Sequence, residues 1–137
     1  MYYYNIHNIV KVASNADVLP DYFKVKKRIK PDLIIKRGNF KFNKRAYKKA
    51  GLKFYGGKDT VILEYMFYGR PIQKLMISGL KKKQTKFYYT ESTDRFFGIQ
   101  NILNLILEIK LLQRGCTLVH SGALSKNGKG VLISAWS

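Results

Sequence analysis

A glycine- and lysine-containing segment near the C-terminus, ALSKNGKG at 123–130, has residue types that can bind phosphate. A phosphate-binding loop has the pattern G-x-x-x-x-G-K-[S/T] between a strand and a helix. Its backbone N–H groups surround the phosphate, its lysine reaches the outer phosphates and its hydroxyl binds Mg²⁺. Here Ala123 is followed after four residues by Gly128-Lys129, but Gly130 stands at the hydroxyl position and a strand is expected next. We therefore interpret residues 127–130 as the turn of a hairpin.

The segment that follows, GVLISAWS at 130–137, carries more information. In proteins with a phosphate-binding loop, that loop begins at the end of a hydrophobic strand, and residues 131–134 have this character. Ala135 then occupies the first loop position, which is usually glycine, and Trp136 and Ser137 follow. The Gly-Lys-Ser/Thr part of such a loop would lie beyond Ser137.

The order of these elements resembles a known family. A helix, the segment GCTLVHSGAL, a short glycine-rich turn and GVLISAWS are similar to the run into the P-loop of HPr kinase-related proteins, over residues 95–137. His120 and Ser121 match the family's strand that ends in histidine and a small residue, and 130–134 match its Gly-led apolar strand. The resemblance implies a phosphoenolpyruvate-carboxykinase-like P-loop fold, with ATP and Mg²⁺ as ligands of the complete family protein. It places His120 near the nucleotide phosphates and Ala135, Trp136 and Ser137 at the start of the loop.

The chain departs from the family pattern at the positions that carry the chemistry. It has no complete Walker A loop, no acidic metal-binding strand downstream and no catalytic base. Phosphoryl transfer depends on charge neutralisation and positioning of the phosphates, so losing the lysine and the Mg²⁺-binding hydroxyl removes the means of catalysis. We therefore expect an N-terminal portion of an ATP-binding P-loop protein that has no catalytic residues, no metal site and no kinase activity as it stands. Nucleotide is expected to bind only if downstream sequence completes the loop.

The other reactive residue types have simpler interpretations. His7 has no partner at a recognisable spacing. Cys116 follows a helix C-terminus, where the helix dipole disfavours a thiolate, so we expect a small core residue. Asp94 is expected to cap a helix, and the remaining acidic residues show no paired or metal-binding spacing.

The elements that position these residues are predicted to form an α/β or α+β fold with a mixed sheet. One long helix is expected over about 95–114, with Thr93 or Asp94 as its N-cap and Gly115 at its C-terminal end. Its apolar residues occupy two adjacent faces, which predicts a helix buried on most sides.

Short strands are predicted before that helix. The clearest pair is a hairpin of residues 60–68 and 72–78, joined across a Gly-Arg-Pro turn. Residues 5–14 and 86–92 favour strands, and 32–43 are expected to form two strands hinged near Gly38. A C-terminal hairpin, residues 117–124 against 131–134, leads toward the absent P-loop. No internal boundary appears, so the chain is treated as a single domain that the resemblance makes incomplete.

The formal charge of +18 and the pI near 10.1 leave a second function class open. Such a charge favours binding to nucleic acid, and the basic segments KVKKRIK, IIKRG, NKRAYKK and GLKKKQTK interleave with Tyr and Phe, as in surfaces that bind RNA or single strands. The same runs are also typical of solvated strand edges, where lysine discourages pairing between sheets. Both interpretations stand at this point.

Composition also bears on localisation. With one cysteine the chain forms no internal disulfide, no signal peptide is visible, and the longest apolar run is too polar to span a bilayer comfortably. We expect a cytoplasmic protein without a membrane partner; the sequence gives no indication of its oligomeric state.

Overall fold

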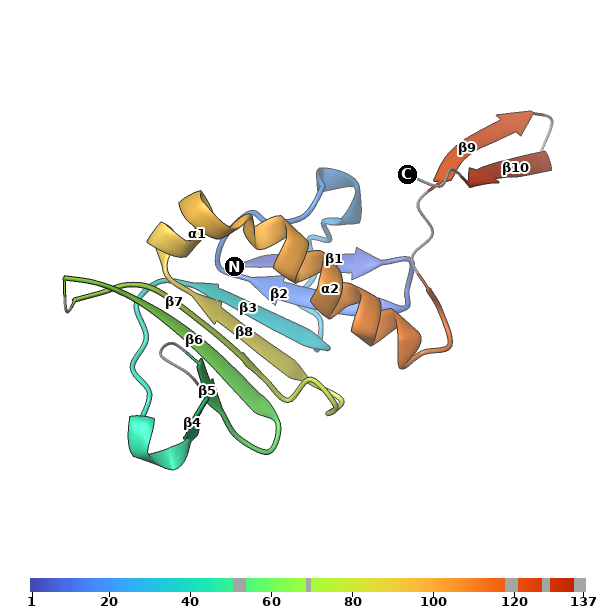
Figure 1. Ribbon diagram of the computed structural model, residues 1–137. Helices are drawn as coiled ribbons and strands as arrows, with labels where there is room; N and C mark the ends of the chain where they lie inside the picture. Colours follow the sequence, from blue (N-terminus) through green and yellow to red (C-terminus); the bar gives the residue numbers. More distant parts are fainter. Residues whose placement is uncertain (51–53, 69, 118–120, 127–128, 135–137) are drawn as a thin grey trace.

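The computed structural model describes residues 1–137 except 51–53, 69, 118–120, 127–128 and 135–137. A mixed eight-stranded sheet forms the body of the molecule, and two helices lie across one of its faces (Figure 1). The strand order is β1-β2-β3-β8-β7-β6-β5-β4. The chain is thus an α+β protein, in agreement with the mixed sheet expected from the sequence.

The strands have the following bounds: β1 Tyr2–Ile6, β2 Val10–Ser14, β3 Leu33–Arg37, β4 Lys48–Ala50, β5 Phe54–Gly56, β6 Thr60–Phe67, β7 Arg70–Ser78, β8 Thr85–Tyr89, β9 Ser121–Lys126 and β10 Lys129–Ser134. The helices within the described residues are two short 3₁₀ turns, η1 Asp21–Phe23 and η2 Lys44–Ala46, and two α-helices, α1 Glu91–Phe97 and α2 Ile99–Leu112.

The predicted hairpin at 60–78 is confirmed as the antiparallel pair β6 and β7, which contains a register shift between Tyr65 and Met66. Its turn differs from the prediction, because Arg70 and Pro71 already belong to β7 and pair with Phe67 and Met66. The N-terminal segment differs from the prediction because it forms two strands, β1 and β2, rather than one. His7 and Asn8 turn the chain with φ of 50° and 60°, and the Ile9 N–H donates to the Ile6 carbonyl at 2.8 Å. Two successive positive φ angles match the type I′ turn that joins hairpin strands, without the glycine that usually marks it.

The centre of the sheet is parallel. β3 pairs in parallel with both β2 and β8, although β8 follows β3 by some fifty residues of chain. Only one strand forms in the region 32–43, because β3 ends at Arg37 and the chain then leaves the sheet at Gly38. The basic segment after it makes the 3₁₀ turn η2 and the edge strand β4.

The long helix expected over 95–114 is wrong in two respects. It is divided into α1 and α2 at Gly98, whose φ of 57° is a left-handed conformation that only glycine adopts at little cost. It is also buried on one side only, since Leu105 and Leu112 are about half exposed. The predicted caps are corrected as well: α1 begins after Thr90, and Asp94 lies within its first turn.

The C-terminal end of α2 agrees with the sequence. Gly115 has a φ of 72°, its N–H donates to the Leu112 carbonyl at 3.0 Å, and the Cys116 N–H donates to the Leu111 carbonyl at 2.9 Å. This bonding pattern is that of a Schellman motif, which satisfies the last carbonyls of a helix.

The main hydrophobic core lies between α2 and the sheet. Its fully buried members include Tyr4, Leu33, Phe87, Leu103 and Ile106. The strands contribute alternate residues to it, as the two-residue period of a strand requires. No helix formed by the described residues combines the length and the apolarity needed to cross a bilayer.

β9 and β10 form a separate antiparallel sheet in which Val131 pairs with Leu124 and Ser134 with Ser121 (Figure 1). The predicted C-terminal hairpin is therefore confirmed, with its first strand starting at Ser121.

Candidate functional site

The residues that the family resemblance assigns to nucleotide binding lie outside the described part of the chain. These are His120 and the three residues Ala135, Trp136 and Ser137. The predicted turn residues 127–128 also lie outside it. What the structure does describe is the strand β10, which ends at Ser134 directly before Ala135.

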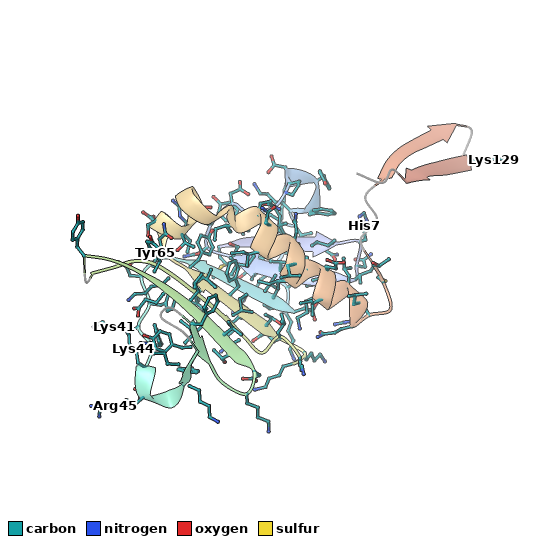
Figure 2. The ribbon with its side chains drawn as sticks, viewed as in Figure 1. His7, Lys41, Lys44, Arg45, Tyr65 and Lys129 are labelled. Carbon is teal, nitrogen blue, oxygen red and sulfur yellow. The ribbon has the colours of Figure 1, made fainter. Side chains whose placement is uncertain are left out.

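The other residues considered for chemistry have structural surroundings. The His7 ring packs edge-on against Phe23 with ring centroids 5.3 Å apart, far from the lysine-rich β4–β5 end of the sheet (Figure 2). Cys116 is half-buried and packs against the main core, as expected for it. Asp94 lies within the first turn of α1 instead of at its N-cap, 3.9 Å from the Arg37 guanidinium. In the part of the chain that the structure describes, no three His, Cys, Asp or Glu residues are close enough together to hold a metal ion.

A more informative arrangement lies on the face of the sheet opposite α2, which we call the open face. The strand register places Tyr3, Ala13, Ile34 and Lys86 in one row across β1, β2, β3 and β8. The adjacent row on the same face brings Lys36 beside Tyr88. Because residues i and i+2 of a strand share a face, both rows point away from the helices.

The segment that leads into β3 forms a wall above this surface. It encloses a groove of about 480 Å³, hereafter the basic groove, whose floor is Tyr3, Ala13 and Ile34. The remaining lining residues are Met1, Arg28, Ile29, Lys30, Pro31, Lys36 and Gln84. The Gln84 side-chain amide donates to the Pro31 carbonyl at 2.9 Å, which fixes the wall to the loop between β7 and β8.

The basic groove has a strongly positive lining. Arg28, Lys30 and Lys36 are all exposed, and no aspartate or glutamate is among its described lining residues. The Lys36 ammonium also lies 5.8 Å from the centre of the Tyr88 ring, a distance at which a cation and an aromatic face attract each other.

The acidic residues of the chain form their ion pairs away from the basic groove. Seven of the eight form ion pairs: Asp17 and Asp21 with Lys24, Asp32 with Arg114, Asp59 with Lys82, Glu64 with Lys44 and Lys74, and Glu91 and Asp94 with Arg37. None of these pairs involves Arg28, Lys30 or Lys36. Within the described residues the positive charge of the basic groove is therefore not neutralised by the protein itself.

The other half of the open face is covered. Phe40 packs on Tyr88 and Phe42 on Tyr55, with ring centroids 6.0 and 5.4 Å apart, so the chain between β3 and β4 lies over β8 and β5. Lys44 reaches down to Glu64, with the ammonium 2.5 Å from a carboxylate oxygen, although that glutamate is 2% exposed. The hydrogen bond to Glu64 raises the pKa of Lys44 above its ordinary value of 10.5.

Two further hollows have simpler explanations. One is lined by Asp17, Asp21 and Asp94 near the start of α2, and Lys24 and Arg37 pair with these carboxylates. The other contains the buried amine of Lys110, which donates to the Lys82 carbonyl at 2.5 Å and ties α2 to the loop between β7 and β8. Burial lowers the pKa of this amine below 10.5.

The sequence indicates the charges of the basic groove but not its floor. The basic runs KVKKRIK and IIKRG, which contain Arg28, Lys30 and Lys36, are interpreted above either as a surface for single strands or as solvated strand edges. The sequence does not show that Tyr3, Ala13 and Ile34 lie in one row across the sheet, because the order of strands depends on contacts between distant segments.

Comparison of the chain with protein-family models, with curated proteins and with solved structures finds no match.

Proposed function

We propose that this chain is the N-terminal portion of a nucleotide-binding P-loop protein related to HPr kinases. The observation that carries the proposal is the order of elements at its end. The helix α2 is followed by the hairpin of β9 and β10, and the apolar part of β10 stops at Ser134, next to the expected loop start at Ala135.

The described residues do not themselves provide a site for ATP and Mg²⁺. Gly130 replaces the metal-binding hydroxyl in ALSKNGKG and belongs to the strand β10 instead of preceding a helix, so no helix N-terminus faces an anion there. The proposal therefore assigns nucleotide binding to a longer chain and no kinase activity to this one. In the same proposal the protein acts in the cytoplasm, which the single cysteine supports.

The test begins with the coding sequence. The proposal requires Gly-Lys-Ser or Gly-Lys-Thr within about five codons after Ser137, in any reading frame, as the spacing of the loop demands. A chain extended through that region is then expected to bind ATP in isothermal titration calorimetry. Its variant with alanine in place of the loop lysine serves as the control and should not bind. Absence of the motif, or phosphotransfer by the chain of 137 residues alone, would contradict the proposal.

A second candidate function is direct binding of nucleic acid. The observation that favours it is the basic groove, where exposed Arg28, Lys30 and Lys36 have no acidic neighbour in the described lining. Titration of the purified chain with labelled DNA and RNA over a range of salt concentrations tests it. Affinity should fall steeply with salt, because neutralising phosphates releases counterions.

A further inference from the structure

The open face has the composition of a binding surface rather than of a solvated sheet. Its uncovered part combines an apolar floor of Ala13 and Ile34 with the Tyr3 ring at one end of the same row and Lys86 at the other. A sheet face that only meets water has no need of Ala13 and Ile34, which are respectively buried and half-buried. The floor is therefore sheltered by the wall above it, yet the groove remains open to solvent.

The chemistry of the groove defines the kind of ligand that fits. Arg28, Lys30 and Lys36 are complementary to a negatively charged ligand. The apolar floor with Tyr3 is complementary to a flat, weakly hydrated group beside that charge. Single-stranded nucleic acid provides both at a regular repeat, since its bases are unstacked and its phosphates follow each base. A duplex keeps the faces of its bases stacked on one another and would leave the floor unfilled.

The row across the sheet is long enough for more than one nucleotide. Tyr3 and Lys86 lie at its two ends, separated by three strand intervals, which corresponds to roughly 14 Å. Lys36 lies on the same face in the adjacent row. Phosphates that flank a base on Tyr3 would thus meet ammonium groups.

We propose that the basic groove binds single-stranded nucleic acid, with a base stacked on Tyr3 and the flanking phosphates held by Arg28, Lys30 and Lys36. The inference rests on the second candidate function and adds where the strand lies, which strand type is preferred and which ring stacks. The P-loop proposal does not depend on it.

The test uses the full chain and fluorescein-labelled oligothymidine and oligouridine, with binding followed by fluorescence anisotropy across a salt series. The groove variant is Arg28→Gln/Lys30→Gln/Lys36→Gln. Its matched control is Lys48→Gln/Lys49→Gln/Lys58→Gln, which removes the same charge from exposed lysines near the β4–β5 end of the sheet. Circular dichroism and the thermal midpoint verify that both variants fold.

The groove variant is expected to lose most of the affinity, and its slope of log K against log salt should fall by about 2, at roughly 0.7 for each lost phosphate contact on a single strand. The control should lose far less. Tyr3→Leu keeps an apolar floor but removes the ring, so it should weaken binding by about tenfold while leaving the salt slope unchanged.

The outcomes separate the two levels of the proposal. If the unaltered chain binds neither oligonucleotide, both the second candidate function and the assignment of binding to the basic groove are overturned. If it binds but the control loses as much as the groove variant, only the groove is overturned. Equal affinity for a duplex of the same sequence, or for vesicles of anionic lipid, would likewise overturn the single-strand assignment.

Discussion

The two faces of the eight-stranded sheet are covered by different means and over different strands. On one face, α2 packs over β1, β2, β3 and β8, and the residues beneath it are fully buried. On the open face, the aromatic segment between β3 and β4 covers β5, β6 and part of β8, where Ile62 is 0% exposed. The basic groove occupies what neither cover reaches.

The difference shows how one sheet can separate stability from recognition. Strand alternation sends Leu33, Ile35 and Phe87 toward α2, and sends Ile34, Lys36 and Tyr88 the other way. Because neighbouring residues of one strand serve opposite faces, a substitution in the core and one in the groove can be made one position apart. The comparison can therefore be tested by pairs of adjacent variants.

The largest effect is expected for Phe87→Ala. Phe87 is 0% exposed at the centre of the main core and stacks on Tyr89 with centroids 5.3 Å apart. Its truncation leaves a cavity, so the free energy of unfolding should fall by about 3–5 kcal/mol in urea denaturation. Tyr88→Ala, on the open face, is the matched control and should lose much less. Equal losses would show that the open face is as important for stability as the helix-covered one.

A second comparison concerns the helix itself. Leu103 is 0% exposed against the sheet, whereas Leu105, two residues later, is 55% exposed. Leu103→Ala should cost about 2–5 kcal/mol of unfolding free energy, while Leu105→Ala should stay within about 0.5 kcal/mol. Chemical denaturation of the two variants measures both values. A large loss for Leu105→Ala would restore the prediction of a helix buried on most sides.

That prediction failed for a reason that lies outside the helix. Helical periodicity gave the position of α2 and its end at Gly115, because both depend on residues close in sequence. How much of the helix surface is covered depends on which strands lie beneath it. The parallel pairing of β3 with β8 settles that, and it joins segments some fifty residues apart. Gly98 was likewise visible as a glycine, but nothing local distinguished a tolerated glycine from one that divides two helices.

The candidate sites differ in the same way. The proposed P-loop approach is a contiguous stretch of sequence, and the structure confirms the hairpin within it. The basic groove joins residues from β1, β2, β3 and two loops. Its charges could be read from the sequence, and its floor could not.

An intermediate effect is expected where the open face is covered. Glu64 is buried between the ammonium groups of Lys44 and Lys74, 2.5 and 3.6 Å away. Glu64→Gln keeps the size of the side chain but removes its charge, which should reduce the unfolding free energy by about 1.5–3 kcal/mol, the usual contribution of a hydrogen bond to a charged group. Differential scanning calorimetry measures it. If the variant is as stable as the unaltered chain, the segment between β3 and β4 is held on the open face by its aromatic contacts alone.

The smallest effect is expected for Asp17, which contacts Tyr4 on the side of the sheet that α2 covers. Asp17 accepts hydrogen bonds from the Lys24 ammonium at 2.6 Å and from the buried Tyr4 hydroxyl at 2.9 Å, and these lower its pKa below the ordinary 3.8. A carboxyl with a lowered pKa in the folded state stabilises the protein above its unfolded pKa, and that contribution disappears as the pH falls through the folded value. The thermal midpoint of the unaltered chain should therefore drop on acidification below 3.8. In Asp17→Asn the midpoint should start slightly lower at neutral pH, and the two curves should converge in acid.

Glu108→Gln is the control for that last experiment, because Glu108 takes part in none of the ion pairs among the described residues. It removes one negative charge without removing the contacts to Lys24 and Tyr4, so its curve should run parallel to that of the unaltered chain. If Glu108→Gln and Asp17→Asn behaved alike, net charge rather than the bonds of Asp17 would govern stability in acid. The helix side and the open face would then respond to the same long-range repulsion, and the separation between them would hold for packing alone.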